Sequence, residues 1–185
     1  NHFEFRTEVN MAHITLMGIS FGGYFATRAA GHEPRIKVLI ANSPILDLHR
    51  YMCSFVGMDP LEMPDSEDFT INDLSSIPNE QMSPQLKAQT EHLITRFGQK
   101  SFKSTFSYLK TFIVDYPLPV LKIPCLALMG IDEGAEPKTQ FNNFCDQTKA
   151  DNYIFNNFEG AGSHCQVGNP SYANAVIYDW LDNIF

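Results

Sequence analysis

No run of apolar residues in the chain approaches the roughly 20 that cross a bilayer, so the sequence does not predict an integral membrane protein. Basic residues are few, because 13 Lys and Arg stand against 21 Asp and Glu and leave a net charge of −8. This balance argues against a nucleic-acid partner, which needs a basic surface. The four cysteines show no C-x-x-C spacing, which favours reduced thiols and a cytoplasmic location over a disulfide framework: Cys53, Cys125, Cys145 and Cys165.

The residues that are present predict a globular α/β fold. With 44% apolar and 18% charged residues, the 185-residue chain can bury a sizeable core. Four short apolar runs have the length of buried strands: 13–18, 38–41, 125–130 and 153–155. Three helical patterns alternate with them, the first of which we expect Gly31 to cap: 21–30, 137–149 and 170–183. Continuous apolar strands between helices are typical of a parallel sheet that is covered on both faces.

The stretch 48–119 breaks this alternation, because about 70 residues between two strands far exceed the usual connection of about 2–6. It contains an acidic run at 58–80 without Lys or Arg, and helical patterns at 84–97 and 101–113. The acidic run is most simply a solvated face. We interpret 48–119 as a helical lid inserted into a core formed by 1–47 and 120–185.

The aromatic residues of this predicted lid suit an apolar or aromatic acyl substrate. At helical spacing, however, such residues more often pack inside the lid itself: Phe55, Phe102, Phe106, Tyr108 and Phe112.

The sequence Gly18-Ile19-Ser20-Phe21-Gly22 is a G-x-S-x-G motif between a predicted strand and a predicted helix. Glycines at 18 and 22 are expected to remove side chains that would collide in the sharp turn at Ser20. The turn exposes the Ser20 hydroxyl at a helix N-terminus, where backbone N–H groups favour negative charge. Ser20 is therefore the candidate nucleophile, and the Phe21 N–H is the candidate donor of an oxyanion hole.

A serine nucleophile needs a base, and His164 is the candidate among six histidines. It lies in a loop of small residues after the last predicted strand, and such loops reach the carboxyl edge of a parallel sheet. The next residue, Cys165, is predicted to be a small, buried apolar residue and not a nucleophile. The other histidines are more simply surface or packing residues: His2, His13, His32, His49 and His92.

Two adjacent carboxylates, Asp132 and Glu133, follow the third predicted strand and are the candidates for the acid that orients the base. Glu136 is expected to be an acid of the first turn of the next helix. The His and Cys spacings favour no metal site, and Gly160 and Gly162 lack the context of a phosphate loop, so no cofactor is predicted.

With these motifs the chain resembles the α/β-hydrolase family over 11–47 and 120–185. Its elbow sequence is most similar to a subgroup that contains fungal polyketide-shortening hydrolases and 2,6-dihydroxypseudooxynicotine hydrolase. The resemblance implies a Ser–acid–His triad in the order Ser20, acid, His164. In this family the acid commonly stands three residues after the glycine that ends the strand, here Gly130, and four before a proline, here Pro137. The count favours Glu133, with Asp132 as the alternative.

The resemblance also implies an activity. It favours hydrolytic cleavage of a carbon–carbon bond beside a ketone through an acyl-enzyme, in a substrate similar to a polyketide. A carboxylesterase, thioesterase or acyl-peptidase is the alternative, and a catalytically silent binding module is a further one.

The family fold begins with strands that precede the elbow, and these have no counterpart in this chain. Because an open sheet edge beside the elbow strand would favour aggregation, we expect the chain to be the C-terminal part of a larger protein. The expected partners are therefore the N-terminal half of the same protein and a small-molecule substrate, with a homo-oligomer left open.

Overall fold

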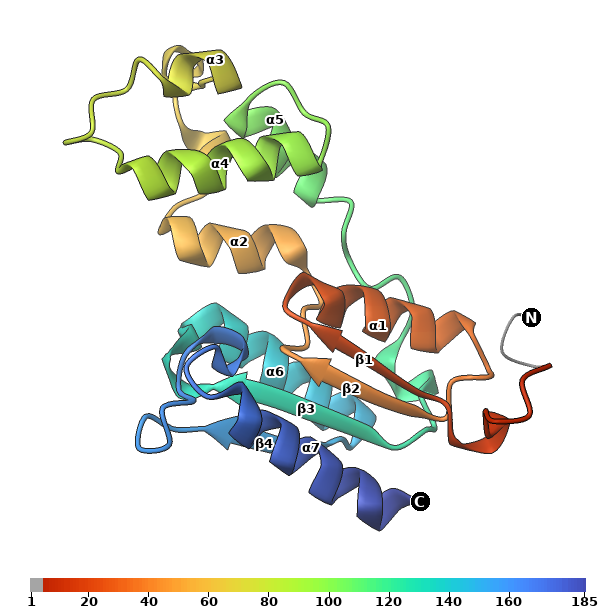
Figure 1. Ribbon diagram of the computed structural model, residues 1–185. Helices are drawn as coiled ribbons and strands as arrows, with labels where there is room; N and C mark the ends of the chain where they lie inside the picture. The colour runs from red at the N-terminus through yellow and green to blue at the C-terminus, as the bar shows by residue number, and fades with distance from the viewer. Residues whose placement is uncertain (1–4) are drawn as a thin grey trace. The chain divides into compact units, whose positions relative to one another are not determined.

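The computed structural model describes residues 5–185 and contains one parallel four-stranded sheet (Figure 1). Its strands are β1 (Thr15–Ile19), β2 (Val38–Asn42), β3 (Cys125–Gly130) and β4 (Asp151–Phe155), in the order β1-β2-β3-β4. All three strand pairs are parallel, so the carboxyl ends of all four strands lie at one edge of the sheet. The α/β fold class predicted from the sequence is confirmed.

Helices cover both faces of this sheet: α1 (Phe21–His32) and α6 (Ala135–Thr148) on one face, and α7 (Pro170–Ile184) on the other (Figure 1). The expected C-cap at Gly31 is wrong, because α1 continues to His32 and Glu33 caps it. The ring of Tyr116 packs against Gly31, where a Cβ atom would come within 2.2 Å of it. Gly31 therefore lies within the helix and leaves space on its surface for the Tyr116 ring.

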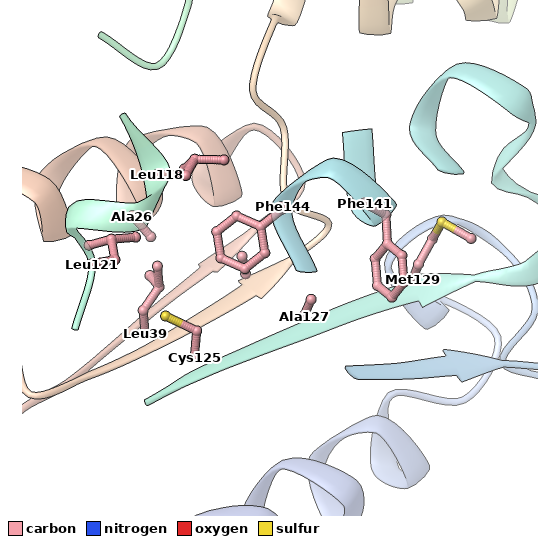
Figure 2. Close-up of a cluster of buried hydrophobic side chains, with 10 residues drawn as sticks. Ala26, Leu39, Leu118, Leu121, Cys125, Ala127, Met129, Phe141 and Phe144 are labelled. Carbon is pink, nitrogen blue, oxygen red and sulfur yellow. The ribbon is translucent and has the colours of Figure 1, made fainter. Parts of the chain in front are cut away.

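Alternate residues of β2 and β3 build two apolar clusters, one on each face of the sheet. Figure 2 shows the cluster beneath α1 and α6, where Leu39, Ala127 and Met129 of the strands meet Phe141 and Phe144 of α6. The opposite cluster joins the intervening strand residues to α7. Since both faces are dry, β2 and β3 are buried along their whole length, which explains why their sequences are continuous apolar runs.

The edge strand β4 begins at Asp151, two residues before the predicted start. Asp151 and Asn152 are exposed, and the Asp151 carboxylate accepts a hydrogen bond from the Trp180 indole at 2.9 Å. Polar residues at the exposed beginning of an edge strand give no apolar signal, so the sequence pattern missed them.

The chain divides into two compact units, and the second comprises Leu48–Phe112 between β2 and β3. We call it the helical unit. It contains four helices: α2 (Leu48–Val56), α3 (Ile71–Leu74), α4 (Pro84–Arg96) and α5 (Phe102–Leu109). The lid was expected to extend to 119, whereas residues from Ile113 onward belong to the unit that contains the sheet.

Short 3-10 helices complete the part of the chain that the structure describes. They are Met11–His13, η2 (Pro60–Glu62), Asp65–Glu67, Leu118–Val120, η5 (Ile131–Glu133) and η6 (His164–Gln166). No helix within residues 5–185 has the length and apolar character that a membrane crossing requires.

Candidate active site

Ser20 occupies a sharp turn between β1 and α1, as the G-x-S-x-G motif predicts. Its φ of 56° and ψ of −127° lie in a region that non-glycine residues rarely adopt, and its N–H donates to the Asn42 carbonyl at 2.5 Å. Such backbone strain persists only where the surrounding structure enforces it. The turn places Ser20 directly before the first turn of α1, and Phe21, the candidate oxyanion donor, is the first residue of that helix.

Gly18 and Gly23 permit this turn, whereas Gly18 and Gly22 were the expected pair. A Cβ atom on Gly18 would lie 2.0 Å from the Gly22 carbonyl oxygen, so close approach requires glycine at 18. Gly22 has nothing within 4 Å of its Cβ position, and the expectation that it avoids a collision is wrong. The next residue, Gly23, has this role, because its Cβ atom would lie 2.0 Å from the Ser43 carbonyl oxygen.

This difference predicts that alanine at position 23 destabilises the fold, whereas alanine at position 22 does not. Gly23→Ala should lower the free energy of unfolding by about 2 kcal/mol or more, since the backbone at Ser43 must move. Gly22→Ala, in the same helix turn, should leave stability unchanged or raise it by up to about 1 kcal/mol, because alanine favours a helix. Urea unfolding of both variants measures this, and equal losses of stability would contradict the assignment.

His164 lies beside Ser20. It begins η6 in the loop between β4 and α7, and its Nε2 is 2.9 Å from Ser20 Oγ. Its Nδ1 is 2.7 Å from Glu133 Oε2, so the imidazole bridges a hydroxyl and a carboxylate. A hydroxyl in this position can transfer its proton to the imidazole, and the carboxylate can stabilise the imidazolium that results.

Glu133 lies at the end of η5, after β3, and its side chain is fully buried. Besides His164 it accepts a hydrogen bond from the Gly130 N–H at 2.8 Å. It also accepts one from the Ser43 hydroxyl, whose Oγ lies 2.9 and 2.7 Å from the two carboxylate oxygens. These contacts fix both oxygens, which suits a carboxylate that must hold an imidazole in one orientation.

Ser43 is a residue of the site that the sequence analysis missed. It follows β2 directly, in Asn42-Ser43-Pro44, and is 1% exposed. With Ser43 included, all four strands contribute a residue to the site from the loop after their carboxyl ends. A small hydroxyl residue directly after a buried strand was the available signal, at the sheet edge where ligand sites form.

The other candidate acids lie elsewhere. Asp132 is exposed, and its carboxylate accepts a hydrogen bond from Asn157 at 3.2 Å. Glu136 lies in the first turn of α6, as expected, and accepts a hydrogen bond from Gln140. The structure therefore brings Glu133, and not Asp132, to His164.

The remaining histidines that the structure describes have other contacts. His13 stacks on Phe185, His32 lies 3.1 Å from the Asp115 carboxylate, and His49 and His92 belong to the helical unit. His2 lies outside the described residues.

Cys165 differs from expectation, since it contacts the imidazole instead of packing as an apolar residue. Its Sγ lies 3.3 Å from His164 Nε2, the nitrogen that also bonds Ser20, and 3.4 Å from the Asn42 carbonyl oxygen. Cys165 and Gln166 have φ values of 53°, and this left-handed turn directs the thiol to the site.

The environment of His164 shifts its protonation. Burial lowers the pKa of His164, but hydrogen bonds and negative charge from Cys165 and Glu133 outweigh this effect, so the pKa lies above its usual 6.5. A group that accepts a proton from Ser20 must be neutral first. The active form of the site is therefore favoured as the pH rises through this raised pKa.

The fold and this constellation define the class. A parallel sheet with a strained serine after one strand, an acid after a later strand and a histidine after the last is the arrangement of the α/β-hydrolase fold. A model of the prolyl oligopeptidase family matches residues 3–95, which is just over half of the chain. The chain belongs to the prolyl oligopeptidase family. No curated protein matches the sequence significantly.

Solved structures with the same fold include enzymes of several kinds. An esterase from Pyrococcus furiosus is 14% identical with a TM-score of 0.56, over 92% of this chain and 54% of that one. The α/β hydrolase GrgF from Penicillium sp. sh18 is 16% identical with a TM-score of 0.56, over 98% and 67%. Proline iminopeptidase from Mycobacterium smegmatis is 16% identical with a TM-score of 0.53, over 93% and 66%. The chain thus spans about half the length of the esterase.

Proposed function

We propose that the protein is a serine hydrolase that cleaves ester or amide bonds of acyl substrates through a covalent acyl-enzyme. The observation that carries this proposal is the unbroken series of hydrogen bonds from Ser20 Oγ to His164 and from His164 to Glu133. A serine hydroxyl becomes an effective nucleophile when a base accepts its proton and a third group orients that base.

In the proposed mechanism, Ser20 Oγ attacks the carbonyl carbon of the substrate while its proton passes to His164 Nε2. The Glu133 carboxylate accepts a hydrogen bond from Nδ1 and stabilises the imidazolium. His164 then gives the proton to the leaving alcohol or amine as the carbon–heteroatom bond breaks. Water adds to the acyl-enzyme with His164 as base, and this step releases the acid and restores Ser20.

The Phe21 N–H is the proposed donor to the oxyanion that forms on the carbonyl oxygen. It follows the nucleophile and lies at the N-terminus of α1, where the partial positive charge of the helix supports a developing negative charge. Every group used in this mechanism is a side chain or backbone group of the chain, so the proposal invokes no metal or cofactor.

The names of the family and of two similar structures support the proposed substrate class. The prolyl oligopeptidase family, the Pyrococcus esterase and the Mycobacterium iminopeptidase have names that point to amide and ester bonds. In both reactions the leaving group takes the proton that His164 received from Ser20. Hydrolysis of a carbon–carbon bond, suggested by the resemblance to polyketide-shortening enzymes, would pass the same proton to a departing carbanion. Because the names above point to ester and amide bonds and none points to a carbon–carbon bond, ester or amide cleavage is the simpler proposal.

We keep the helical unit as a proposed lid. The unit begins at Leu48, six residues after β2 ends at Asn42. Ser20 and His164 also follow the carboxyl ends of strands. Among its aromatic side chains, Phe102 and Phe106 are buried and belong to its own core, whereas Phe55 and Tyr108 are exposed.

A panel of aryl esters, aminoacyl and peptidyl arylamides, thioesters and β-diketones tests the proposed function. We expect turnover of esters or arylamides and none of the diketones. Diketone cleavage without ester or amide turnover would favour carbon–carbon hydrolysis instead. If no substrate reacts and a fluorophosphonate forms no adduct, the protein is a silent binding module and the proposal fails.

A further inference from the structure

A second group of chemically reactive side chains lies in the helical unit, apart from the triad residues. It consists of His49, Cys53 and Asp59, whose ligand atoms all lie within 4.8 Å of one another. It is the one group of three or more potential metal-ligating side chains found within residues 5–185. His49 and Cys53 have an H-x-x-x-C spacing, which mixes the two residue types and is neither a paired-histidine nor a paired-cysteine motif.

The local sequence explains how these three residues meet. His49 and Cys53 are four residues apart on α2, so their side chains share one face of the helix. Gly57, with a φ of 80°, ends this helix, and its N–H donates to the Cys53 carbonyl at 2.9 Å. The chain then turns back, which brings Asp59 to the same face two residues later.

Asp59 is held in place by a second role. It caps η2, because its Oδ1 accepts a hydrogen bond from the Leu61 N–H at 3.0 Å. His49 is 8% exposed and packs edge-on against the fully buried ring of Phe106, with a centroid distance of 6.2 Å. Two of the three side chains are thus oriented by contacts outside the group, as in a site that is formed before its ligand binds.

The two distances from His49 to the other ligand atoms are close to those around a tetrahedral metal ion. His49 Nε2 lies 3.3 Å from Asp59 Oδ1 and 3.7 Å from Cys53 Sγ. Nitrogen and oxygen ligands about 2.1 Å from a tetrahedral zinc ion lie about 3.4 Å apart, and a sulfur at about 2.3 Å lies about 3.5 Å from the nitrogen. The two printed distances differ from these values by about 0.1 and 0.2 Å, and all three ligand atoms lie within 4.8 Å of one another.

We propose that His49, Cys53 and Asp59 bind one zinc ion, with water as the fourth ligand. A thiolate, an imidazole and a carboxylate form a donor set that zinc accepts, and the thiolate disfavours magnesium and calcium. The ion would link α2 to η2 within the helical unit and so stabilise that unit. The proposal is independent of the proposed hydrolase activity, because neither Ser20 nor His164 takes part in it.

Cobalt substitution tests the site directly on the full chain. After treatment with a chelator, Co²⁺ is titrated into the protein and its absorption spectrum is recorded. We expect one equivalent to give the intense thiolate-to-cobalt band and the visible bands of a tetrahedral ion. Zn²⁺ should displace the cobalt with the same stoichiometry and raise the unfolding temperature of the metal-free protein.

Variants identify the ligands. Cys53→Ser should remove the thiolate band, and Asp59→Asn, which keeps the helix cap, should weaken zinc binding by more than about tenfold. Cys145→Ser and Glu62→Gln serve as matched controls and should bind as the wild type does. The proposal is overturned if the wild-type spectrum lacks the thiolate band, or if Cys165→Ser rather than Cys53→Ser removes it. Because the wild-type spectrum decides the first point, a variant that fails to fold does not obscure the result.

Discussion

Replacing Ser20 by alanine is expected to lower kcat/KM for the best ester or amide substrate by about 10⁵-fold or more, because the variant lacks the hydroxyl that forms the proposed acyl-enzyme. The expected loss is large because the triad acts as a unit. Without the nucleophile, His164 and Glu133 contribute little to the reaction. Steady-state kinetics on the most reactive substrate measures this, and intact-protein mass spectrometry after fluorophosphonate treatment provides a second measurement.

The control for this substitution is Ser171→Ala, in the first turn of α7, where Ser171 is exposed. It should form the fluorophosphonate adduct at the wild-type rate, whereas Ser20→Ala should form none. Alanine at 20 must adopt the same left-handed backbone as serine, so the two variants should unfold at similar urea concentrations. Retained turnover in a folded Ser20→Ala protein would show that another nucleophile acts, and Cys165, 3.3 Å from His164 Nε2, would be the first to examine.

Much of the sheet could be predicted because its central strands are buried on both faces. Leu39, Ile40, Leu126 and Leu128 are almost fully buried, and this double burial produces the apolar runs from which the strands were predicted. Where burial is one-sided the prediction lost accuracy, as at the exposed start of β4. The helix α2 was not predicted, although its apolar residues lie on one face. Only two helical patterns, 84–97 and 101–113, were predicted within the insertion 48–119.

The site was only partly predictable, for a physical reason. Ser20 and His164 have local signatures, a strained turn among glycines and a loop of small residues after a strand. Ser43 contacts Glu133, which lies 90 residues further along the chain. Cys165 reaches the site through a left-handed backbone conformation. Neither property can be derived from neighbouring residues. The identity of the acid also depends on a long-range fact, namely which of two adjacent side chains turns inward.

Substituting the two adjacent acids should separate them clearly. Glu133→Gln is expected to lower kcat by about 10³–10⁴-fold, because a neutral amide cannot stabilise the imidazolium and favours the wrong tautomer of His164. Asp132→Asn should change kcat by less than about twofold, since Asp132 is exposed and its replacement can still accept the hydrogen bond from Asn157. The pair is well matched, because each change removes one negative charge and keeps the shape of the side chain.

The pH profile distinguishes an orienting acid from a merely structural one. In the wild type, kcat/KM should rise with pH through the pKa of His164, which Glu133 and Cys165 hold above 6.5. Removing the charge of Glu133 lowers the pKa of His164, so the rising limb of Glu133→Gln should move to lower pH even as its height falls. Glu133→Asp retains the charge and should recover part of the activity. A structural defect alone would reduce the amplitude without moving the limb, and a large loss in Asp132→Asn with none in Glu133→Gln would reverse the assignment of the acid.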